Sequence, residues 1–349
     1  MKPKNCINLH IIQNENHYLN FLHRSKNDYP CCLLFLDNYT GLNIYNDKLS
    51  LSENVILPKN KSNILIKNKS LLKKILCVYF FSNELKREIY PLINGYKEIN
   101  IIIGNDGPLQ KASIAIVKKI NKNISVKLLI DTIMGDRKKT LSAKIKSVIE
   151  PALSFFEVSQ YFPGILGTSS LINSISVSHK SNRDVLINRG VSPEIIFIED
   201  SPRISWLKRE AYNFPSNKNI LFVAGAWEWH GRADIEIWQS RVMQDIISFA
   251  SLHPYGNRIK IRLHPRQFKS STSKLNAKFI CNKESLEESI ISSDKIISFR
   301  SSALYDASVI GKEVFVYEEN APHAPKNKFI GSIERLNSIN EIFKLIKNA

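Results

Sequence analysis

The sequence predicts an α/β protein built from two Rossmann-like domains that face each other across a cleft. Its 349 residues exceed the usual size of one compact core. Short apolar runs rich in β-branched residues alternate with segments of helix length, which is typical of parallel sheets covered by helices on both faces. The alternation stops at 199–218, where Pro and Ser interrupt it, and then restarts. We therefore predict an N-terminal domain at 1–198, a linker at 199–218 and a C-terminal domain at 219–349.

In the N-terminal domain the short apolar runs predict strands, and the longer segments with helical periodicity predict helices. The expected strands are 6–12, 31–36, 99–104, 126–131 and 174–178. The expected helices are 70–95, 108–120 and 141–156.

The C-terminal domain repeats the pattern. Its expected strands are 219–226, 258–265, 277–282, 295–300 and 313–318. Its expected helices are 234–251, 284–292, 302–310 and 339–349. Both halves therefore predict one parallel sheet each.

Composition indicates the class of partner and the cellular compartment. The net charge of +17 favours an anionic partner such as phosphate, nucleic acid or an acidic membrane face, although a chain rich in Lys, Asn and Ile can also owe its basicity to AT-rich codons. Five cysteines without CxxC or zinc spacing argue against a disulfide scaffold and predict a reducing, cytoplasmic protein. Polar residues interrupt the opening stretch 1–16, so we expect any membrane attachment to be peripheral.

Ligands of open α/β sheets bind beyond the carboxyl ends of the strands, so the residues after each strand are the candidates. In "KIRLHPRQF" (260–268), Pro265 lacks an N–H and ends the strand, which aims His264 into the expected cleft. That imidazole could donate a hydrogen bond to a phosphate oxygen or protonate a leaving phosphate, with Arg262 and Arg266 adding charge. The alternative is a strand-end turn with a solvent-facing histidine.

A pair of serines follows another strand of the same domain. Ser301 and Ser302, in "SFRSSALYDAS" (298–308), precede a predicted helix, where free backbone N–H groups and the helix dipole attract an anion. Two hydroxyls there can cradle a phosphate. The alternative is ordinary N-capping, for which one serine is enough.

Two aspartates follow strands of the N-terminal domain. Asp131 ends the run in "VKLLIDTIMGD" (126–136), and Asp106 lies in "IIIGNDGP" (101–108). A carboxylate at such a position suits a general base that takes a proton from a hydroxyl group. The alternative for both is a turn or helix-capping role, since Asp-Gly marks a turn and Pro108 fits the first helical turn. The nucleotide fingerprints GxGxxG and GxxxxGK[ST] are absent.

The order of a strand-end acid, a His-Pro pair and a Ser-Ser pair resembles the bacterial sialyltransferases and polysialyltransferases of the GT-B type. In that group an acidic-acidic-Gly motif supplies the base, the histidine contacts the CMP phosphate and assists its departure, and the serines bind that phosphate. The resemblance implies these roles for the residues that match the motifs, namely His264, Pro265, Ser301 and Ser302.

The acidic motif departs from the family pattern. Asp131 has no adjacent acidic residue or Gly, whereas Asp106 is followed by Gly107 but preceded by Asn105. The base is therefore either aspartate, with Asp131 favoured because it ends the later strand.

Two neighbouring families share parts of the pattern. The stretch "IIFIEDSPRISWL" (195–207) resembles the G-x-P-R linker of CDP-glycerol glycerophosphotransferases, which also have an HP motif and serines before a helix. The two acidic strand ends resemble those of UDP-GlcNAc 2-epimerases. All three groups handle a nucleotide-activated sugar or polyol in a GT-B cleft.

Further candidates follow the first and last strands of the C-terminal domain. The stretch 224–238 presents side chains that could stack on a base or sugar and bind phosphate, or pack the interdomain hinge: Trp227, Glu228, Trp229, His230 and Arg232. Glu318 and Glu319 could accept ribose hydroxyls, as an acidic residue does in many GT-B enzymes, or could be ordinary surface charge.

The basic stretch "GDRKKTLSAKIK" (135–146) has two interpretations. It could form a face for the anionic inner membrane leaflet, where a lipid-linked acceptor would lie, at about 1 kcal/mol per basic residue. It could equally be a solvated helix face.

Together these features predict an inverting, metal-independent glycosyltransferase of surface polysaccharide or lipopolysaccharide synthesis, without a cofactor. The N-terminal domain would bind a glycan or lipid-linked acceptor, and the C-terminal domain a nucleotide-activated sugar, with CMP as the expected nucleotide. No DxD sequence occurs near a strand end, so hydroxyls, histidine and a helix N-terminus would meet the phosphate charge. The alternatives are a CDP-glycerol-dependent or UDP-sugar-dependent transferase, a UDP-GlcNAc 2-epimerase-like enzyme, and a nucleic-acid-binding protein. The last is disfavoured because the basic residues are spread along the chain and no nucleic-acid motif appears.

Overall fold

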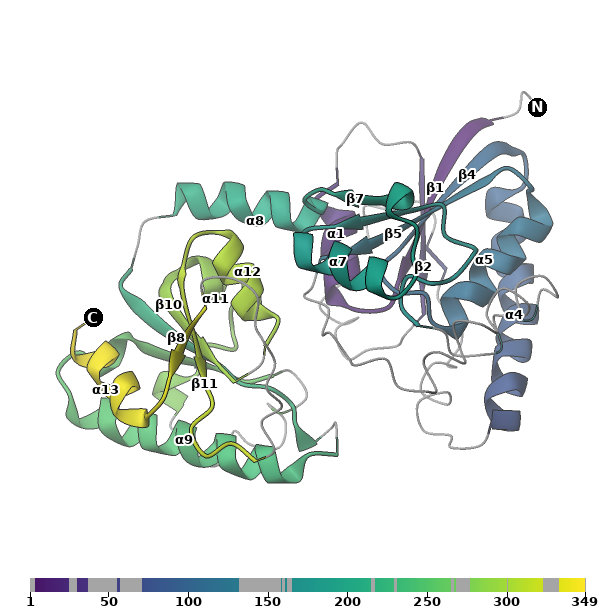
Figure 1. The fold of residues 1–349 in the computed structure, drawn as a ribbon. Helices are drawn as coiled ribbons and strands as arrows, with labels where there is room; N and C mark the ends of the chain where they lie inside the picture. The colour runs from purple at the N-terminus through teal and green to yellow at the C-terminus, as the bar shows by residue number, and fades with distance from the viewer. Residues whose placement is uncertain are drawn as a thin grey trace. The chain divides into compact units, whose positions relative to one another are not determined.

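The chain folds into two compact α/β units, Met1–Arg203 and Ile204–Ala349 (Figure 1). The computed structural model describes residues 4–24, 30–36, 55–56, 71–131, 158, 161, 165–214, 217–228, 231–264, 267, 277–299, 301–322 and 333–348. Each unit contains one parallel sheet, which confirms the predicted fold class of two parallel-sheet α/β domains. The boundary between the units falls inside the segment predicted as a linker, and that segment contains a helix, α8 (Pro202–Asn213).

The N-terminal sheet has the strand order β3-β2-β1-β4-β5-β6-β7 in the described part of the chain. Its strands are β1 (Lys4–Ile12), β2 (Cys31–Phe35), β3 (Val55–Ile56), β4 (Tyr96–Ile103), β5 (Ile124–Ile130), β6 (Ser174–Val177) and β7 (Ile196–Ile198). Its helices are α1 (Glu15–Leu22), α4 (Leu71–Ile93), α5 (Pro108–Ile120) and α7 (Lys180–Asn188). The predicted strands and the helices at 70–95 and 108–120 are confirmed, while the predicted helix 141–156 lies outside the described residues.

Alternation along β1 divides its side chains between two cores. Ile7, Leu9 and Ile11 point to the face that also buries Phe81 and Leu85 of α4. On the other face Ile12 packs with Tyr18 and Phe21 of α1 and with Leu33 and Phe35 of β2, a set that forms a smaller cluster. Because each fully buried large apolar side chain contributes about 1.5–3 kcal/mol, coverage of both faces supplies most of the driving force for this unit.

The C-terminal sheet has the order β12-β11-β10-β8-β9. Its strands are β8 (Asn219–Val223), β9 (Ile259–Arg262), β10 (Ser293–Ser298), β11 (Glu313–Tyr317) and β12 (Glu334–Leu336). Its helices are α9 (Ala233–Leu252), α11 (Leu286–Ile291), α12 (Ala303–Val309) and α13 (Ile339–Lys347).

The strand predicted at 277–282 is wrong. The segment forms a 3-10 turn at Ala277–Phe279 and a single bridge between Ile280 and Ile261. The Asn282 side chain then accepts the Leu263 N–H at 2.9 Å and donates to the Leu263 carbonyl at 2.7 Å. A side chain therefore satisfies the backbone groups that a strand ladder would otherwise use.

Both sheets contain a topological switch point, where successive connections diverge to opposite sides. In the N-terminal sheet it lies between β1 and β4, and in the C-terminal sheet between β8 and β10. Ligands of open parallel sheets bind at the carboxyl ends of the strands that flank such a point. The order of the strands thus identifies two edges that are suited to bind ligands.

The buried His10 predicts an acid-sensitive fold. Burial, and then the nearby charge of Arg24, lowers the pKa of this imidazole to about 3, from about 6.5 in an unfolded chain. Between these values the unfolded chain binds a proton that the folded chain does not. The free energy of unfolding therefore falls as the pH drops through this window, by up to about 1.4 kcal/mol per pH unit for this group. Burial lowers the pKa of His17 to about 4, which adds a change of the same sign.

Urea unfolding of the wild type and of His10→Phe between about pH 7 and about pH 4 measures this effect, since the phenyl ring fills the site without titrating. In the variant the free energy of unfolding should depend less steeply on pH, because the contribution of His10 is lost and that of His17 remains. Equal slopes in both proteins would show that His10 does not control the acid sensitivity.

Candidate functional site

The carboxyl edge of the C-terminal sheet brings together predicted residues from four neighbouring strands. Trp227 follows β8, His264 follows β9, Ser301 and Ser302 follow β10, and Glu318 follows β11. Four other predicted residues, Trp229, His230, Pro265 and Arg266, lie outside the described residues. The sequence therefore identified one edge of this sheet, and β8 and β10 flank its switch point.

The loop after β8 is fixed by a buried glutamine of α9. Gln239, which is 1% exposed, accepts the Gly225 N–H at 2.8 Å and donates to the Gly225 carbonyl at 2.9 Å. Its Oε1 also accepts the Trp227 indole N–H at 3.2 Å. A Cβ atom at Gly225 would lie 2.7 Å from that indole nitrogen, so the close approach of the ring requires glycine.

The half-buried indole of Trp227 packs inside the C-terminal unit. Its ring meets Phe299 edge-on, with ring centroids 5.3 Å apart, and Phe299 also contacts Trp238, which stacks on Tyr317. The aromatic cluster thus runs beneath the carboxyl ends of β8, β10 and β11. Sequence analysis missed Trp238, whose place in the helical period of α9 gave it the appearance of an ordinary core residue.

A second α9 residue links the loops that follow β8 and β9. Glu236 accepts the N–H groups of Trp227 and Glu228 at 3.0 and 3.4 Å, and its other carboxylate oxygen accepts a hydrogen bond from the Gln267 side chain. The Gln267 N–H also donates to the His264 carbonyl at 2.8 Å. Together with the Asn282 clamp on Leu263, these bonds fix the backbone on both sides of the half-buried His264.

The two serines have different environments. The Ser301 hydroxyl accepts the Ala303 N–H at 3.2 Å, so this serine satisfies the first turn of α12. Ser302 is exposed and makes no side-chain capping bond. One hydroxyl therefore serves the helix, as expected for ordinary capping, and the other faces solvent at the switch point.

The two glutamates that follow β11 also have different environments. Glu318 is half-buried and accepts from the Arg335 guanidinium at 3.1 Å. The Glu319 carboxylate accepts the Tyr317 hydroxyl and the Ile339 N–H, each at 2.7 Å, and so caps α13. Glu319 is thus part of the framework, whereas Glu318 lies at the edge with a cationic neighbour.

Arg232 pairs with Asp234 on the first turn of α9. Its Nε and Nη2 atoms donate to the two carboxylate oxygens at 3.0 and 2.8 Å, and Nη2 also donates to the Pro322 carbonyl at 3.3 Å. The guanidinium hydrogen bonds lower the pKa of Asp234 to about 2. The pair ties the start of α9 to the chain that follows β11.

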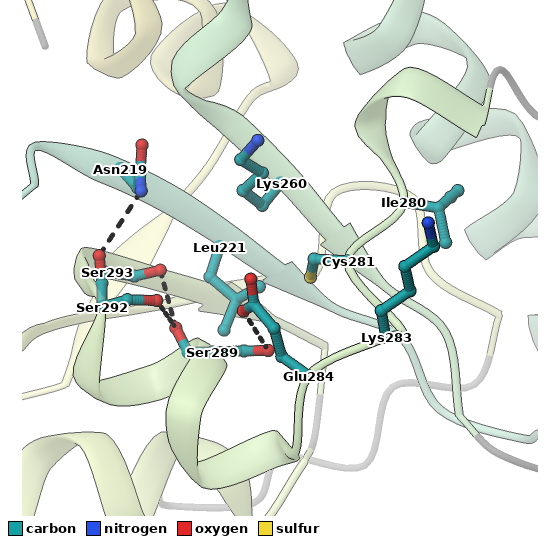
Figure 2. Close-up of a pocket in the computed structure, with 10 residues that line it drawn as sticks. All are labelled: Asn219, Leu221, Lys260, Ile280, Cys281, Lys283, Glu284, Ser289, Ser292 and Ser293. Atoms are coloured by element: carbon teal, nitrogen blue, oxygen red, sulfur yellow. Dashed lines mark hydrogen bonds between the residues drawn. The ribbon is translucent and has the colours of Figure 1, made fainter.

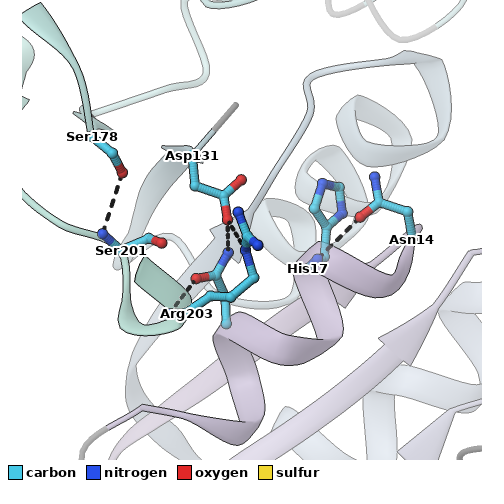
Figure 3. Close-up of polar contacts among 7 residues, drawn as sticks. Asn14, His17, Asp131, Ser178, Ser201 and Arg203 are labelled. Carbon is cyan, nitrogen blue, oxygen red and sulfur yellow. Dashed lines mark hydrogen bonds and ion pairs between the residues drawn. The ribbon is translucent and has the colours of Figure 1, made fainter. Parts of the chain in front are cut away.

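In the N-terminal unit Asp131 belongs to a buried polar cluster (Figure 3). Its Oδ2 accepts the Arg203 Nε–H at 2.9 Å and the Asn20 amide at 3.0 Å, and Asn20 in turn accepts the Arg203 backbone N–H at 3.0 Å. The Arg203 side chain is fully buried. This cluster joins the end of β5 to α1 and to the start of α8, so Asp131 lies in a structural ion pair.

Asp106 has different surroundings, beside the switch point of the N-terminal sheet. Its carboxylate accepts the Gly167 N–H at 3.0 Å, and burial raises the pKa of the carboxyl group even though Lys111 and backbone N–H groups oppose that change. Next to it, Asn105 donates to Gln13, which follows β1, at 3.4 Å. The end of β4 is thereby linked to the end of β1 across the switch point.

His17 is a residue of this edge that sequence analysis missed. Its imidazole lies so close to Gly104 that a Cβ there would be 2.0 Å from Nε2, and its Nδ1 accepts the Gln13 N–H at 3.3 Å. Burial keeps the ring neutral, because it lowers the pKa to about 4 while Asp131 opposes the shift. The available signal was a histidine in the first turn of the helix that follows the first strand, together with a glycine at the end of the neighbouring strand.

A separate cavity of about 160 Å³ lies at the opposite, amino end of the C-terminal sheet (Figure 2). Asn219 and Ser293, which begin β8 and β10, line it together with Lys260, Lys283 and other mostly polar residues. None of the predicted site residues that the structure describes lines it. Among the described residues no three His, Cys, Asp or Glu side chains gather as a group that could hold a metal ion.

Comparison with known proteins identifies the fold. No family model and no curated protein matches the sequence. Among solved structures, a UDP-N-acetylglucosamine 2-epimerase aligns with a TM-score of 0.57 and 11% identity over 99% of this chain and 87% of that one. The UDP-GlcNAc 2-epimerase of Methanocaldococcus jannaschii, in complex with UDP-GlcNAc and UDP, gives a TM-score of 0.54 with 11% identity over 98% and 92%.

A third similar structure is that of a polymerase. The wall teichoic acid polymerase TagF, soaked with CDPG, gives a TM-score of 0.54 with 13% identity over 99% of this chain and 79% of that one. At these identities the similarity establishes the fold. The chain has the two parallel-sheet α/β domains of GT-B proteins.

Replacement of Gln239 by Leu should destabilise the protein by about 2 kcal/mol, because it leaves the buried polar groups of Gly225 without their partner. Gln244, exposed on the same helix, provides the matched control, and Gln244→Leu should change the free energy of unfolding by less than about 0.5 kcal/mol. Urea unfolding measures both. Similar values for the two variants would show that the clamp does not stabilise the loop.

Asp131→Asn and Asp106→Asn should differ in stability. The first removes the charge that faces the buried Arg203 guanidinium and should cost about 3 kcal/mol. The second keeps an oxygen that can accept the Gly167 N–H, so its cost should stay below about 1 kcal/mol. Thermal and urea unfolding compare them, and an Asp131→Asn protein as stable as the wild type would contradict the structural role of the ion pair.

Proposed function

We propose that this protein is a nucleotide-sugar-dependent enzyme of the GT-B type whose C-terminal unit binds the nucleotide at the carboxyl edge of its sheet. The observation that carries the proposal is the gathering of Trp227, His264, Ser302 and Glu318 around the switch point between β8 and β10. The similar structures support it, because the epimerase complex contains UDP-GlcNAc and UDP and TagF was soaked with CDPG.

The residues of this edge have complementary roles in the proposal. The exposed Ser302 hydroxyl and the His264 imidazole donate hydrogen bonds to the phosphate of the donor. Glu318 accepts the ribose hydroxyls, and the indole of Trp227 supports the loop beside them. Glu236, Gln239 and Asn282 position these groups through the loop backbones, so rigid elements carry the site.

In the N-terminal unit the surroundings of the two aspartates favour Asp106 as the acid-base group. Burial raises its pKa, which is the direction expected for a carboxylate that takes up a proton. Asp131 instead forms an ion pair with the fully buried Arg203 and orients the cluster. In a transfer reaction Asp106 takes the proton of the acceptor hydroxyl, whose oxygen bonds to the anomeric carbon while the bond from that carbon to the phosphate oxygen breaks. His264 donates a proton or hydrogen bond to the departing phosphate.

The proposed reaction is transfer of a sugar or a polyol phosphate from a UDP-linked or CDP-linked donor to a glycan or lipid-linked acceptor. For a polyol phosphate the acceptor oxygen attacks the phosphorus that carries the polyol, and the diphosphate P–O bond to the nucleoside monophosphate breaks, so that CMP leaves from a CDP-linked donor. A CMP-activated sugar is the second candidate, supported by the His-Pro and Ser-Ser pairs, although the acidic-acidic-Gly motif of that family is absent. Epimerisation of a UDP-sugar is the alternative reaction, supported by the fold shared with 2-epimerases.

Nucleotide binding should raise the melting temperature, because a ligand that binds only the folded state stabilises it. We expect UDP or CDP to shift the wild type in a differential scanning panel with CMP, GDP and a DNA oligomer. The shift should be reduced in Ser302→Ala. A shift with CMP alone would indicate a CMP-activated sugar as the donor. Stabilisation by DNA without any response to a nucleotide would contradict the proposal.

His264→Ala should lower turnover of the responding donor by about 100-fold or more if His264 acts as a general acid. His253→Ala, a change of the half-buried histidine that caps α9, is the matched control and should keep wild-type turnover. NMR of the nucleotide-sugar separates the reactions, since epimerisation yields a second nucleotide-sugar and transfer releases the nucleotide. Wild-type turnover in His264→Ala would remove the acid role.

A further inference from the structure

One face of α4 exposes a row of large apolar side chains. Leu76, Tyr79, Phe80 and Tyr90 are 45%, 50%, 58% and 49% exposed. Tyr79 and Phe80 lie three and four residues after Leu76, and Tyr90 lies fourteen residues after it, close to four full turns, so all four side chains lie along one side of the helix. Single exposed apolar residues are normal, but Leu76, Tyr79 and Phe80 form one exposed apolar group with Tyr90 further along the same face, and such a group marks an interaction surface.

The opposite face of α4 explains why these side chains cannot turn inward. Phe81, Leu85 and Ile89 on that side are at most 1% exposed and pack in the core of the N-terminal unit. A rotation of the helix that buried the outer row would expose these core residues. The outer face is therefore fixed toward the surface by the packing of the inner one.

The same outer face is basic. Lys86 and Arg87 are exposed there, and they line a hollow in the surface together with Asn83 and Tyr90. The acidic residues of this stretch, Glu84 and Glu88, are half-buried and lie on the flank of the helix, away from the middle of the exposed row. The face therefore combines aromatic rings with positive charge and has no exposed acidic side chain between Leu76 and Tyr90.

We propose that this face of α4, defined by Leu76, Tyr79, Phe80, Lys86, Arg87 and Tyr90, docks the protein on an anionic lipid bilayer. Aromatic side chains that flank lysine and arginine on an amphipathic helix are suited to the boundary between lipid headgroups and acyl chains. The Lys86 and Arg87 side chains would attract anionic headgroups, at about fivefold in affinity for each basic residue near the surface. No helix among the described residues could span a bilayer, so the contact is peripheral.

Charge distinguishes a bilayer from a second copy of this chain. A twofold contact through this face would pair the surface with itself and bring two copies of Lys86 and Arg87 together. No exposed acidic residue within the face could neutralise them, so like charges would oppose such a dimer. An anionic surface instead satisfies both the charge and the aromatic rings.

Docking on a bilayer would bring the proposed enzyme to a lipid-linked acceptor. Only this biological purpose rests on the proposed function. The contact itself requires no nucleotide. Vesicle binding without substrate therefore tests it separately from the nucleotide panel, and either proposal can fail alone.

Co-sedimentation of the full chain with vesicles tests the surface. We expect binding to phosphatidylcholine vesicles that contain phosphatidylglycerol, little binding to phosphatidylcholine alone, and weakening by salt. Lys86→Glu with Arg87→Glu should lower the partition coefficient by about tenfold or more. Tyr79→Ser with Phe80→Ser should lower it by a similar factor because the apolar contact is lost.

Matched changes in the other unit control for net charge and exposed apolar area. Lys344→Glu with Lys347→Glu on α13 reverses the same charge, and Tyr212→Ser with Leu252→Ser removes two side chains that are 91% and 90% exposed. These controls should bind like the wild type, and every variant should keep its melting temperature. Equal loss in the controls, or no preference for anionic vesicles, would overturn the proposal. A dimer in light scattering that the α4 variants convert to a monomer would also overturn it, and would assign the face to a second copy.

Discussion

The constraint on which this structure depends is that an all-parallel sheet must be covered on both faces. The strands are consequently runs of buried apolar residues, as in β2 and β8, and helices occupy the space above and below them. Side chains that bind or react are thereby excluded from the faces and confined to the edges. The strand order then determines the switch point of each sheet, and ligands bind at the carboxyl ends of the two strands that flank it.

A loop at such an edge can position a binding group only if hydrogen bonds fix the loop backbone. Here the backbone is fixed by the buried Gln239 and the half-buried Asn282 and Glu236, each of which satisfies several partners. Gln239 binds both backbone groups of Gly225, Asn282 binds both of Leu263, and Glu236 accepts from two successive N–H groups. Since an unsatisfied buried polar group costs about 1–3 kcal/mol, such a network favours one loop conformation over its alternatives.

The sequence predicted the elements that have a strong local pattern. The apolar runs of β1, β4 and β8 and the periodic helices α5 and α9 were recognised because burial dictates their composition. The short strands β3, β7 and β12 were missed because two or three residues are too few to show a pattern. Helix α7 was missed because its sequence is mostly polar. The prediction of a linker at 199–218 also missed α8. The Pro and Ser residues that suggested a linker include Ser201 and Pro202, which stand at the start of this helix.

The site was predictable to the level of the edge and no further. A strand end is visible in the sequence, so His264, Ser302 and Asp106 could be singled out. The partners that decide what each residue does come from distant segments, as when Arg203 reaches Asp131 across 72 residues and Asn20 across 183. No local pattern records such a contact.

The two aspartates show the consequence. Sequence order favoured Asp131 as the base, because it ends the later strand. Asp131 is held in an ion pair with a buried guanidinium, whereas burial raises the pKa of the Asp106 carboxyl group although Lys111 opposes that change. The two carboxyl groups, which follow adjacent strands, thus have different environments, and their neighbours rather than their place in the sequence are the reason why we propose Asp106 as the acid-base group.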